Sequence, residues 1–333
     1  MSIGVLGTGS YLPDEEVSNA TLAARVGVDE EWIVRKTKIE SRRFADGGEA
    51  TSDLAAAAGR AALVSAGLRA DEIDLIIVST STPDSPQPPT ASLVQNLLGA
   101  WNAAAFDINV VCSGFIYALD LARSVIAGRP GSRVLVIAAD LYSRSLDFTD
   151  RRTAVLLGDG AGAAVVGEVG RGYGIERIDL VARGDLQRLI RVEAGGTRVP
   201  ASVETVAGGG HFFKMEGRQV REFVLEHVPA AMVRLLESAG VAPDEVAHIV
   251  PHQPNGMLLD ELDKQAGFTN ARMHRTVERY GNVGSASVPV TLDAANRAGS
   301  LRDGDFILLS AFGGGMAMGH CLLRWQESPT QRS

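Results

Sequence analysis

Short, almost uninterrupted apolar runs recur along the chain between longer helix-like stretches, and this alternation limits the fold more than any other feature. The clearest runs are LIIVS at 75–79 and VLVIAA at 134–139. Strands that are apolar on both faces are typical of parallel sheets covered by helices on both sides. The pattern therefore predicts an α/β protein.

The order of these segments repeats once. LIIVST is matched by HIVPHQ, VLVIAA by FILLSAF, and GDGAGAAVVG by GGGMAMGHCLL. Two copies of one βαβαβαββ unit, residues 1–170 and 171–333, explain this order most simply. We expect helices at 51–66, 90–98, 112–126, 218–239, 257–265 and 288–298, and strands at 3–7, 74–79, 105–108, 133–139, 161–166, 174–182, 248–250 and 306–310, with a last strand ending near 323.

One segment, 183–213, breaks the periodic pattern with two clusters of glycines. We expect a loop-rich insertion there, and long loops in compact enzymes often line or cover a site.

The composition excludes several classes of protein. With a net charge of −8 and a pI near 5.3, the chain lacks the clustered positive charge that nucleic-acid binding needs. It has no uninterrupted apolar tract of about 18 residues and no secretory signal pattern. Its two cysteines, Cys112 and Cys321, are too few for a disulfide framework or, without histidines, a zinc site. We therefore expect a cytoplasmic enzyme with neither a membrane span nor a bound metal.

Cys112 is the first candidate for chemistry. It follows the strand-like run AAFDI and precedes a helix-like stretch, and a helix N-terminus favours the thiolate form of a cysteine. The alternative is a small cysteine buried in the core. Cys321, which lies in the last predicted strand, fits that alternative.

His252 and Asn282 are the next candidates for chemistry. His252 comes just after a predicted strand, and Asn282 lies in a glycine-flanked turn before a helix. Catalytic side chains collect at the carboxyl ends of strands in α/β sheets, although a core histidine and an ordinary turn asparagine are the plainer alternatives. A thiol with two neutral hydrogen-bond donors suits acyl chemistry.

Two glycine-rich motifs are weaker indications of function. GDGAGA at 158–163 lacks the lysine of a phosphate-binding loop and precedes a strand, so it fits no nucleotide fingerprint. AFGGGMAMG at 311–319 offers backbone N–H groups that a substrate oxygen can approach closely.

Taken together, the chain resembles the thiolase superfamily and, within it, β-ketoacyl-acyl-carrier-protein synthase III. The matching motifs span nearly the whole chain in the family's order: GTGSYLP (7–13), EEWIVRKTKI (30–39), CSGF (112–115), TDR (149–151), GDGAGAAVV (158–166), HQPN (252–255), YGNVGSAS (280–287) and AFGGG (311–315). The resemblance implies a homodimer with a five-layered α-β-α-β-α fold and a tunnel wide enough for pantetheine.

The resemblance also implies roles for individual residues. Cys112 matches the acyl-accepting nucleophile, His252 and Asn282 the pair that promotes decarboxylation, and Gly314 the backbone donor that completes an oxyanion hole with the Cys112 N–H. Further matches are Trp32 and Arg151 beside the coenzyme A adenine, Gly217 and Asn255 along the pantetheine arm, Phe312 beside the catalytic histidine, and Gln87, Tyr142, Leu156 and Leu157, with Phe312, around the acyl group.

Several positions depart from the family's usual pattern. Lys36-Thr37-Lys38 replaces Arg-Thr-Gly, Arg152 replaces a glycine, Gln87 replaces an aromatic residue that the partner subunit lends, and Met257 replaces a basic residue used for carrier-protein docking. Less basic character weakens attraction to an acidic carrier protein. We therefore expect a member from specialised metabolism with an unusual primer or acceptor.

The function that this resemblance implies is decarboxylative Claisen condensation, in fatty acid, polyketide or other secondary-metabolite biosynthesis, by an acyltransferase of the synthase III type. Cys112 takes an acyl group from acyl-CoA, and a malonyl thioester, malonyl-CoA or malonyl carrier protein, extends it. Coenzyme A thioesters are substrates and no cofactor stays bound, while an acyl carrier protein is a further candidate partner. The main alternative is an acyltransferase that passes the acyl group to a hydroxyl or amine without decarboxylation; a non-catalytic partner subunit and a cysteine hydrolase fit less well.

Overall fold

Two sheets of five strands form the frame of the molecule, which a computed structural model describes for residues 1–327. The strands of the first sheet are β1 (Ser2–Tyr11), β4 (Leu75–Ser79), β5 (Ala104–Ile108), β6 (Val134–Leu141) and β7 (Asp159–Val169). Those of the second are β8 (Gly174–Ala182), β11 (Val246–Pro251), β12 (Arg272–Met273), β13 (Phe306–Gly313) and β14 (Ala317–Arg324).

The two sheets have the same topology. The first is ordered β1-β7-β6-β4-β5 and the second β8-β14-β13-β11-β12. In each sheet, the three strands at one side are parallel to one another. The other two strands each pair antiparallel with the strand before them in this order or after it. This correspondence confirms the predicted duplication of a βαβαβαββ unit.

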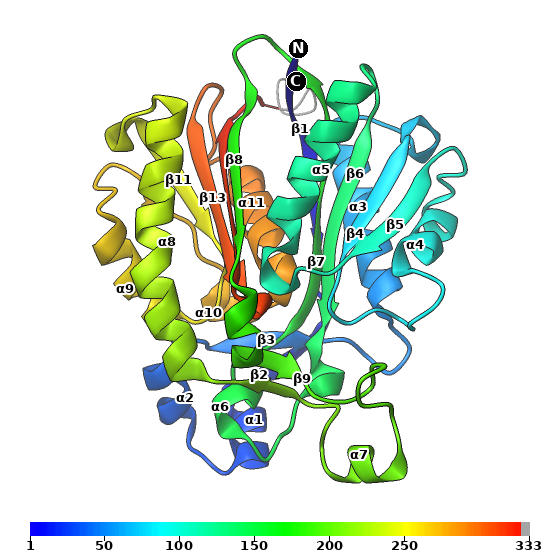
Figure 1. The fold of residues 1–333 in the computed structure, drawn as a ribbon, viewed down its shortest axis with the longest axis vertical. Helices are drawn as coiled ribbons and strands as arrows, with labels where there is room; N and C mark the ends of the chain where they lie inside the picture. The colour runs from blue at the N-terminus through cyan, green and yellow to red at the C-terminus, as the bar shows by residue number, and fades with distance from the viewer. Residues whose placement is uncertain (328–333) are drawn as a thin grey trace.

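Three layers of helices separate and cover the sheets (Figure 1). The first sheet carries α3 (Thr51–Ala66) and α4 (Thr90–Leu98) on its outer face, and the second carries α8 (Gly217–Ala239) and α9 (Gly256–Ala266). Between the sheets lie α5 (Gly114–Gly128) and α11 (Ser287–Arg297), whose apolar side chains share one core with strands of both sheets. The five-layered arrangement is therefore confirmed.

Helix α5 and the turn before it form a long apolar stretch. The stretch Val111–Gly128, which is α5 with the turn before it, is long and apolar enough to cross a membrane by length and hydropathy alone. It lies between the two sheets (Figure 1), where a helix must be apolar on more than one face to pack.

Most of the short elements that the sequence did not predict gather at one end of the molecule, lowest in Figure 1, whereas the unpredicted strand β12 lies at the border of the second sheet. Those that gather there are the hairpin β2 (Glu15–Ser18) and β3 (Ser41–Phe44), the ribbon β9 (Ile190–Val192) and β10 (Phe213–Met215), and the helices α1 (Asn19–Val26), α2 (Glu30–Thr37), α6 (Arg151–Ala154), α7 (Val203–Ala207) and α10 (Val277–Tyr280). The ribbon and α7 belong to the insertion at 183–213. Elements of three to eight residues carry too few periods for a hydrophobic pattern to reveal them.

Several predicted boundaries move for local reasons. The helix expected from residue 112 begins at Gly114, because Val111–Ser113 forms a separate 3₁₀ turn. Strand β1 runs on to Tyr11, past Gly9, where a Cβ would lie 2.2 Å from the backbone nitrogen of Ala62 in α3. Helix α8 ends as expected, with Gly240 in the left-handed conformation.

Candidate active site

Cys112 lies in a tight turn that points its side chain toward the second sheet. Val111, just before it, has a φ of +47°, and a β-branched residue in that region costs about 1–3 kcal/mol. The Val111 N–H donates to Asn109 Oδ1 (3.1 Å), and Ser113 Oγ donates to the Ala317 carbonyl in β14 (2.9 Å). These contacts on both sides hold the turn in its strained form.

The wall opposite Cys112 must be a glycine. A Cβ added to Gly313 would lie 2.6 Å from Cys112 Cβ and 3.1 Å from Sγ, so any side chain there would collide with the thiol. Gly314, which the sequence singled out, lies instead against Val111. Its role as an oxyanion donor stays a prediction.

Cys112 is a buried thiol in the resting protein. Burial raises the pKa of the Cys112 thiol well above its usual value, the charge of Asp140 raises this pKa further, and a backbone N–H lowers it only in part. The expected advantage of a helix N-terminus is therefore outweighed by desolvation.

His252 follows β11 and is 2 % exposed. Its backbone N–H donates to the Ser310 carbonyl in β13 (2.7 Å), and the ring meets Phe312 edge-on at 5.4 Å between centroids. Burial lowers the pKa of His252 to about 3, so the imidazole is neutral near pH 7. Its Nδ1 has no hydrogen-bond partner among the described residues.

Asn282 is held by backbone bonds on both sides. Its N–H donates to the Leu156 carbonyl (2.8 Å), and its own carbonyl accepts from the Gly158 N–H (2.9 Å). The side-chain Oδ1 accepts from the Gly284 N–H (3.0 Å). With Oδ1 engaged, the amide NH₂ on the other side of Cγ is the group that Asn282 presents as a donor.

These three side chains, which lie far apart in the sequence, line one cavity of about 40 Å³, enough for about three waters. Tyr142, Leu157 and Phe312, three of the predicted acyl-pocket residues, line it too. The other lining residues are Ile190, Phe213, Met215, Val220, Pro254, Gly313 and Met316. Ile190 and Phe213 come from the insertion at 183–213, so this segment lines the cavity, and Met215 follows it directly.

Two of the predicted acyl-pocket residues have other surroundings. Leu156 is buried and contributes its carbonyl to Asn282, but it does not line the cavity. Gln87 is exposed in the loop between β4 and α4. A place for Gln87 in the acyl pocket of a partner subunit stays a prediction.

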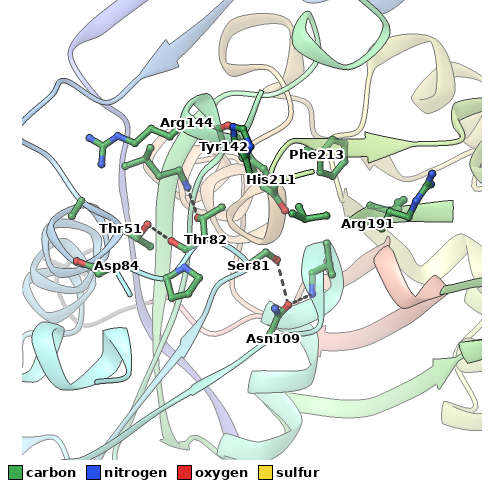
Figure 2. Close-up of a pocket in the computed structure, with 17 residues that line it drawn as sticks. Thr51, Ser81, Thr82, Asp84, Asn109, Tyr142, Arg144, Arg191, His211 and Phe213 are labelled. Carbon is green, nitrogen blue, oxygen red and sulfur yellow. Dashed lines mark hydrogen bonds between the residues drawn. The ribbon is translucent and has the colours of Figure 1, made fainter. Parts of the chain in front are cut away.

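A second pocket of about 520 Å³ adjoins the first, and Figure 2 shows the residues that line it. Tyr142, Ile190 and Phe213 line both spaces. Tyr142 and Phe213 meet edge to face at 5.6 Å, so these two rings form a partition between Cys112 and the larger pocket.

The four residues predicted to bind coenzyme A lie on α2, on α6, at the start of α8 and just before α9. The Arg151 guanidinium carbon lies 5.4 Å from the Trp32 ring centroid, so the predicted pair are neighbours. Gly217 begins α8 next to Met215, and Asn255 Oδ1 caps α9 by accepting from the Leu258 N–H (2.9 Å). Contact with coenzyme A stays a prediction for all four.

Lys38, one of the departures from the family pattern, links α2, which carries Trp32, to α9, which follows His252. It ends α2 with a φ of +58°, and its ammonium pairs with Asp260 of α9. Arg275 donates to the same carboxylate (2.7 Å). Gly256 makes this approach possible, because a Cβ there would lie 2.6 Å from Lys38 Cβ.

Comparison with known proteins agrees with this geometry. Residues 106–184 match the family described as "3-Oxoacyl-[acyl-carrier-protein (ACP)] synthase III", and residues 236–325 match its C-terminal part. An acetoacetyl CoA synthase, NphT7, of Streptomyces sp. (strain CL190) is 51% identical over 96% of this chain and 98% of its own. A beta-ketoacyl-[acyl-carrier-protein] synthase III of Caldanaerobacter subterraneus subsp. tengcongensis is 43% identical over 98% and 99%.

Solved structures give the same result. The 3-oxoacyl-(acyl carrier protein) synthase III of Pseudomonas aeruginosa PAO1 has a TM-score of 0.90 at 34% identity and covers 98% of both chains. The priming beta-ketosynthase of a polyketide biosynthetic pathway has a TM-score of 0.90 at 34% identity, over 98% of this chain and 97% of that one. A chain that shares this much sequence and backbone with several members over almost its entire length belongs to the 3-oxoacyl-[acyl-carrier-protein] synthase III family.

Proposed function

We propose that this protein condenses a short acyl-CoA with malonyl-CoA and releases carbon dioxide. The observation that carries the proposal is the convergence of Cys112, His252 and Asn282 on one small, buried cavity. We expect the enzyme to act in the cytoplasm and to make a β-ketoacyl thioester for secondary metabolism.

In the first half of the reaction, Cys112 accepts the acyl group. Its sulfur attacks the thioester carbonyl, the carbon–sulfur bond to coenzyme A breaks, and the thiol proton ends on the departing coenzyme A thiol. Backbone N–H groups of Cys112 and of the glycine turn at Gly314 are the proposed donors to the developing oxyanion.

In the second half, the malonyl group loses its carboxylate as CO₂, which leaves an enolate. A neutral His252 with its proton on Nε2 and the NH₂ of Asn282 are the two donors that stabilise the enolate oxygen. The enolate carbon then attacks the acyl group on Cys112, a carbon–carbon bond forms, and the cysteine thiolate leaves and is reprotonated. The low pKa of His252 keeps its ring a neutral donor at pH 7.

The retained Asn282 favours condensation over transfer to a hydroxyl or amine. Its NH₂ group and a neutral His252 offer two donors for an enolate oxygen. Transfer without decarboxylation forms no enolate and does not need this pair.

The size of the cavity supports a short primer. Tyr142 and Phe213 close the space beyond Cys112, and the remaining 40 Å³ matches a group of about two or three non-hydrogen atoms, such as acetyl. NphT7, the relative at 51% identity, is named an acetoacetyl CoA synthase, and an acetoacetyl product contains one acetyl unit joined to a second two-carbon unit.

The charges on α6, α8 and the β9–β10 ribbon support coenzyme A, rather than a carrier protein, as the bearer of the malonyl group. Five basic side chains on these elements pair with acidic neighbours: Arg152 with Asp150, Lys214 with Glu193, Arg191 with Glu193 and Glu216, Arg218 with Glu222, and Arg221 with Glu261. Met257, where the family usually has a basic residue, is 39% exposed. A surface whose positive charges are neutralised attracts an acidic carrier protein weakly.

Acyl loading tests the proposal directly. After incubation with acetyl-CoA, intact-protein mass spectrometry should show the gain of one acetyl group, and malonyl-CoA should then be consumed with release of CO₂. Cys112→Ala should lose the mass gain completely, whereas Cys321→Ala, a buried core cysteine in β14, should keep it. Loading without any CO₂ release from malonyl-CoA or a malonyl carrier protein would rule out condensation, and at least tenfold better kcat/KM with the carrier protein would rule out the proposed extender.

We also propose that the enzyme is a homodimer joined at β5. This strand lies at the border of the first sheet, and no strand of residues 1–327 pairs with its outer edge. Phe106 in β5 and Trp101 just before it are 38% and 68% exposed. An open apolar edge is a ready site for pairing with another chain.

Sedimentation measurements test the dimer. The wild-type chain should sediment as a dimer, and Phe106→Glu should shift it toward the monomer because like charges would face each other across the paired strands. Val203→Glu, at an exposed position of α7 far from β5 (Figure 1), serves as the control. A wild-type monomer at micromolar concentration would contradict the proposal.

A further inference from the structure

Asp140 is a buried carboxylate that no step of the mechanism above uses. It lies near the end of β6 and is 0% exposed. It accepts hydrogen bonds from the N–H of Ser81 (2.8 Å) and from the N–H (2.7 Å) and Oγ (2.8 Å) of Ser285. Ser81 follows a strand of the first sheet, and Ser285 belongs to the second half of the chain.

One branch of this network leads to the nucleophile. Ser81 Oγ donates to Asn109 Oδ1 (3.4 Å), and the same oxygen accepts the Val111 N–H (3.1 Å), as Figure 2 shows for Ser81 and Asn109. Val111 is the strained residue directly before Cys112. The bond at Asn109 therefore supports the backbone conformation that aims the thiol.

The other branch leads to Asn282. Ser285 lies in the 3₁₀ turn Gly284–Ala286, and the Gly284 N–H donates to Asn282 Oδ1 (3.0 Å). A Cβ on Gly284 would lie 2.3 Å from Asp140 Oδ2, so the turn packs directly on the carboxylate. Ser285 Oγ also contacts the Ser79 carbonyl (3.2 Å), at the end of β4.

We propose that Asp140 is a positioning residue that holds the Cys112 turn and the Asn282 turn in register across the two halves of the chain. This inference rests on the proposed function for its effect on catalysis. A single acceptor that binds donors from both halves couples their placement, and a displacement of about 1 Å between reacting groups can cost about 100-fold in rate.

The charge of Asp140 supplies a readout that does not depend on catalysis. Burial raises the pKa of Asp140 to about 6, although the bonds from Ser81 and Ser285 oppose this rise, so the group is ionised at pH 8. Its negative charge contributes to the raised pKa of the Cys112 thiol. Removing the charge should make Cys112 easier to ionise.

The test compares Asp140→Asn with Asp159→Asn, both in a Cys321→Ala background that leaves one thiol. Asp159 is the matched control: it is also 0% exposed and accepts two backbone N–H bonds of 2.8 Å, from Ala45 and Ser143. We expect Asp140→Asn to displace the pH dependence of Cys112 alkylation by iodoacetamide toward lower pH and to lower kcat by about 10- to 100-fold. Asp159→Asn should leave the alkylation profile in place.

Two milder variants separate the branches and keep the test available if Asp140→Asn does not fold. Ser81→Ala removes the bond to Asn109 and should slow Cys112 loading more than CO₂ release. Ser285→Ala removes the hydroxyl bond to Asp140 and should slow CO₂ release more than loading. Unchanged kcat in all three variants, or equal losses in both half-reactions with an unmoved alkylation profile, would overturn the positioning role. Alkylation needs no substrate, so a failure of the proposed condensation would leave that result intact.

Discussion

Asn282→Ala is expected to lower the rate of CO₂ release from malonyl-CoA by about 10²–10³-fold while Cys112 still loads its acyl group. The reason is that the amide NH₂ is one of two proposed donors to the enolate oxygen, and removing one such donor typically costs that much. The loading step needs no stabilised enolate. Rapid-quench mass spectrometry for loading and capture of labelled CO₂ for decarboxylation separate the two half-reactions.

His252→Ala should give the same split, because His252 supplies the second donor. Asn270→Ala, at an exposed asparagine that bonds the Asp244 carbonyl and lines neither pocket, is the matched control and should keep both half-reactions. If Asn282→Ala loses loading and decarboxylation equally, Asn282 shapes the cavity and does not act on the malonyl group. If neither half-reaction changes, the proposed enolate site is wrong.

Folding stability is expected to fall steeply as the pH drops below about 6. Burial lowers the pKa of His252 to about 3 and those of His274 and His320 to about 4, from 6.5 in the unfolded chain. Between these values the unfolded chain binds more protons than the native one, so native stability, complete above pH 6.5, is lost as the pH falls. Asp140 acts in the opposite direction, because its raised pKa makes the native state take up a proton as the pH falls through 6.

The net effect is large. The three histidines give the unfolded chain about three more bound protons than the native state. Asp140 offsets about one of these, and Asp107 and Asp159, whose pKa values burial also raises, offset a smaller part. The unfolded chain therefore carries about one to two excess protons. At 1.36 kcal/mol per proton and pH unit, the free energy of unfolding should fall by about 1.4–2.7 kcal/mol per pH unit between pH 6 and 4.5. Domains are typically stable by about 5–15 kcal/mol, so the loss is readily measured by urea denaturation.

His320→Leu checks this origin. His320 is 2% exposed, and its Nε2 has no partner among the described residues, while Nδ1 contacts Ser310 Oγ at 3.1 Å. Removing its titration should flatten the slope by about 1.4 kcal/mol per pH unit. Cys321→Ala, the next residue in β14, should lower stability at every pH without changing the slope. A slope that His320→Leu leaves unchanged would show that this ring is not the source of the pH dependence.

Much of the architecture was predictable because it depends on repeated local patterns. The buried runs of β4 and β6, the glycine that ends α8, and the matching order of segments in the two halves are all visible without tertiary contacts. Cys112 and His252 were predictable as candidates because each follows a strand, β5 in the first sheet and β11 in the second, and the resemblance to the family grouped Asn282 with them. The short elements around the cavity were not, because three to eight residues carry little periodicity.

What only the tertiary structure decided is the environment of those side chains. That Gly313, and not Gly314, lies against the thiol depends on where β13 ends relative to Cys112. That the thiol and the imidazole are neutral at rest depends on how completely the two halves bury them. The link from Asp140 to both catalytic turns joins residues up to 145 positions apart in the chain. The sequence by itself determined the duplicated fold and pointed to three candidate residues, since these follow from local pattern and family motifs. Protonation state, cavity size and positioning arise only when distant segments pack, because burial and charge act through space and leave no local signature.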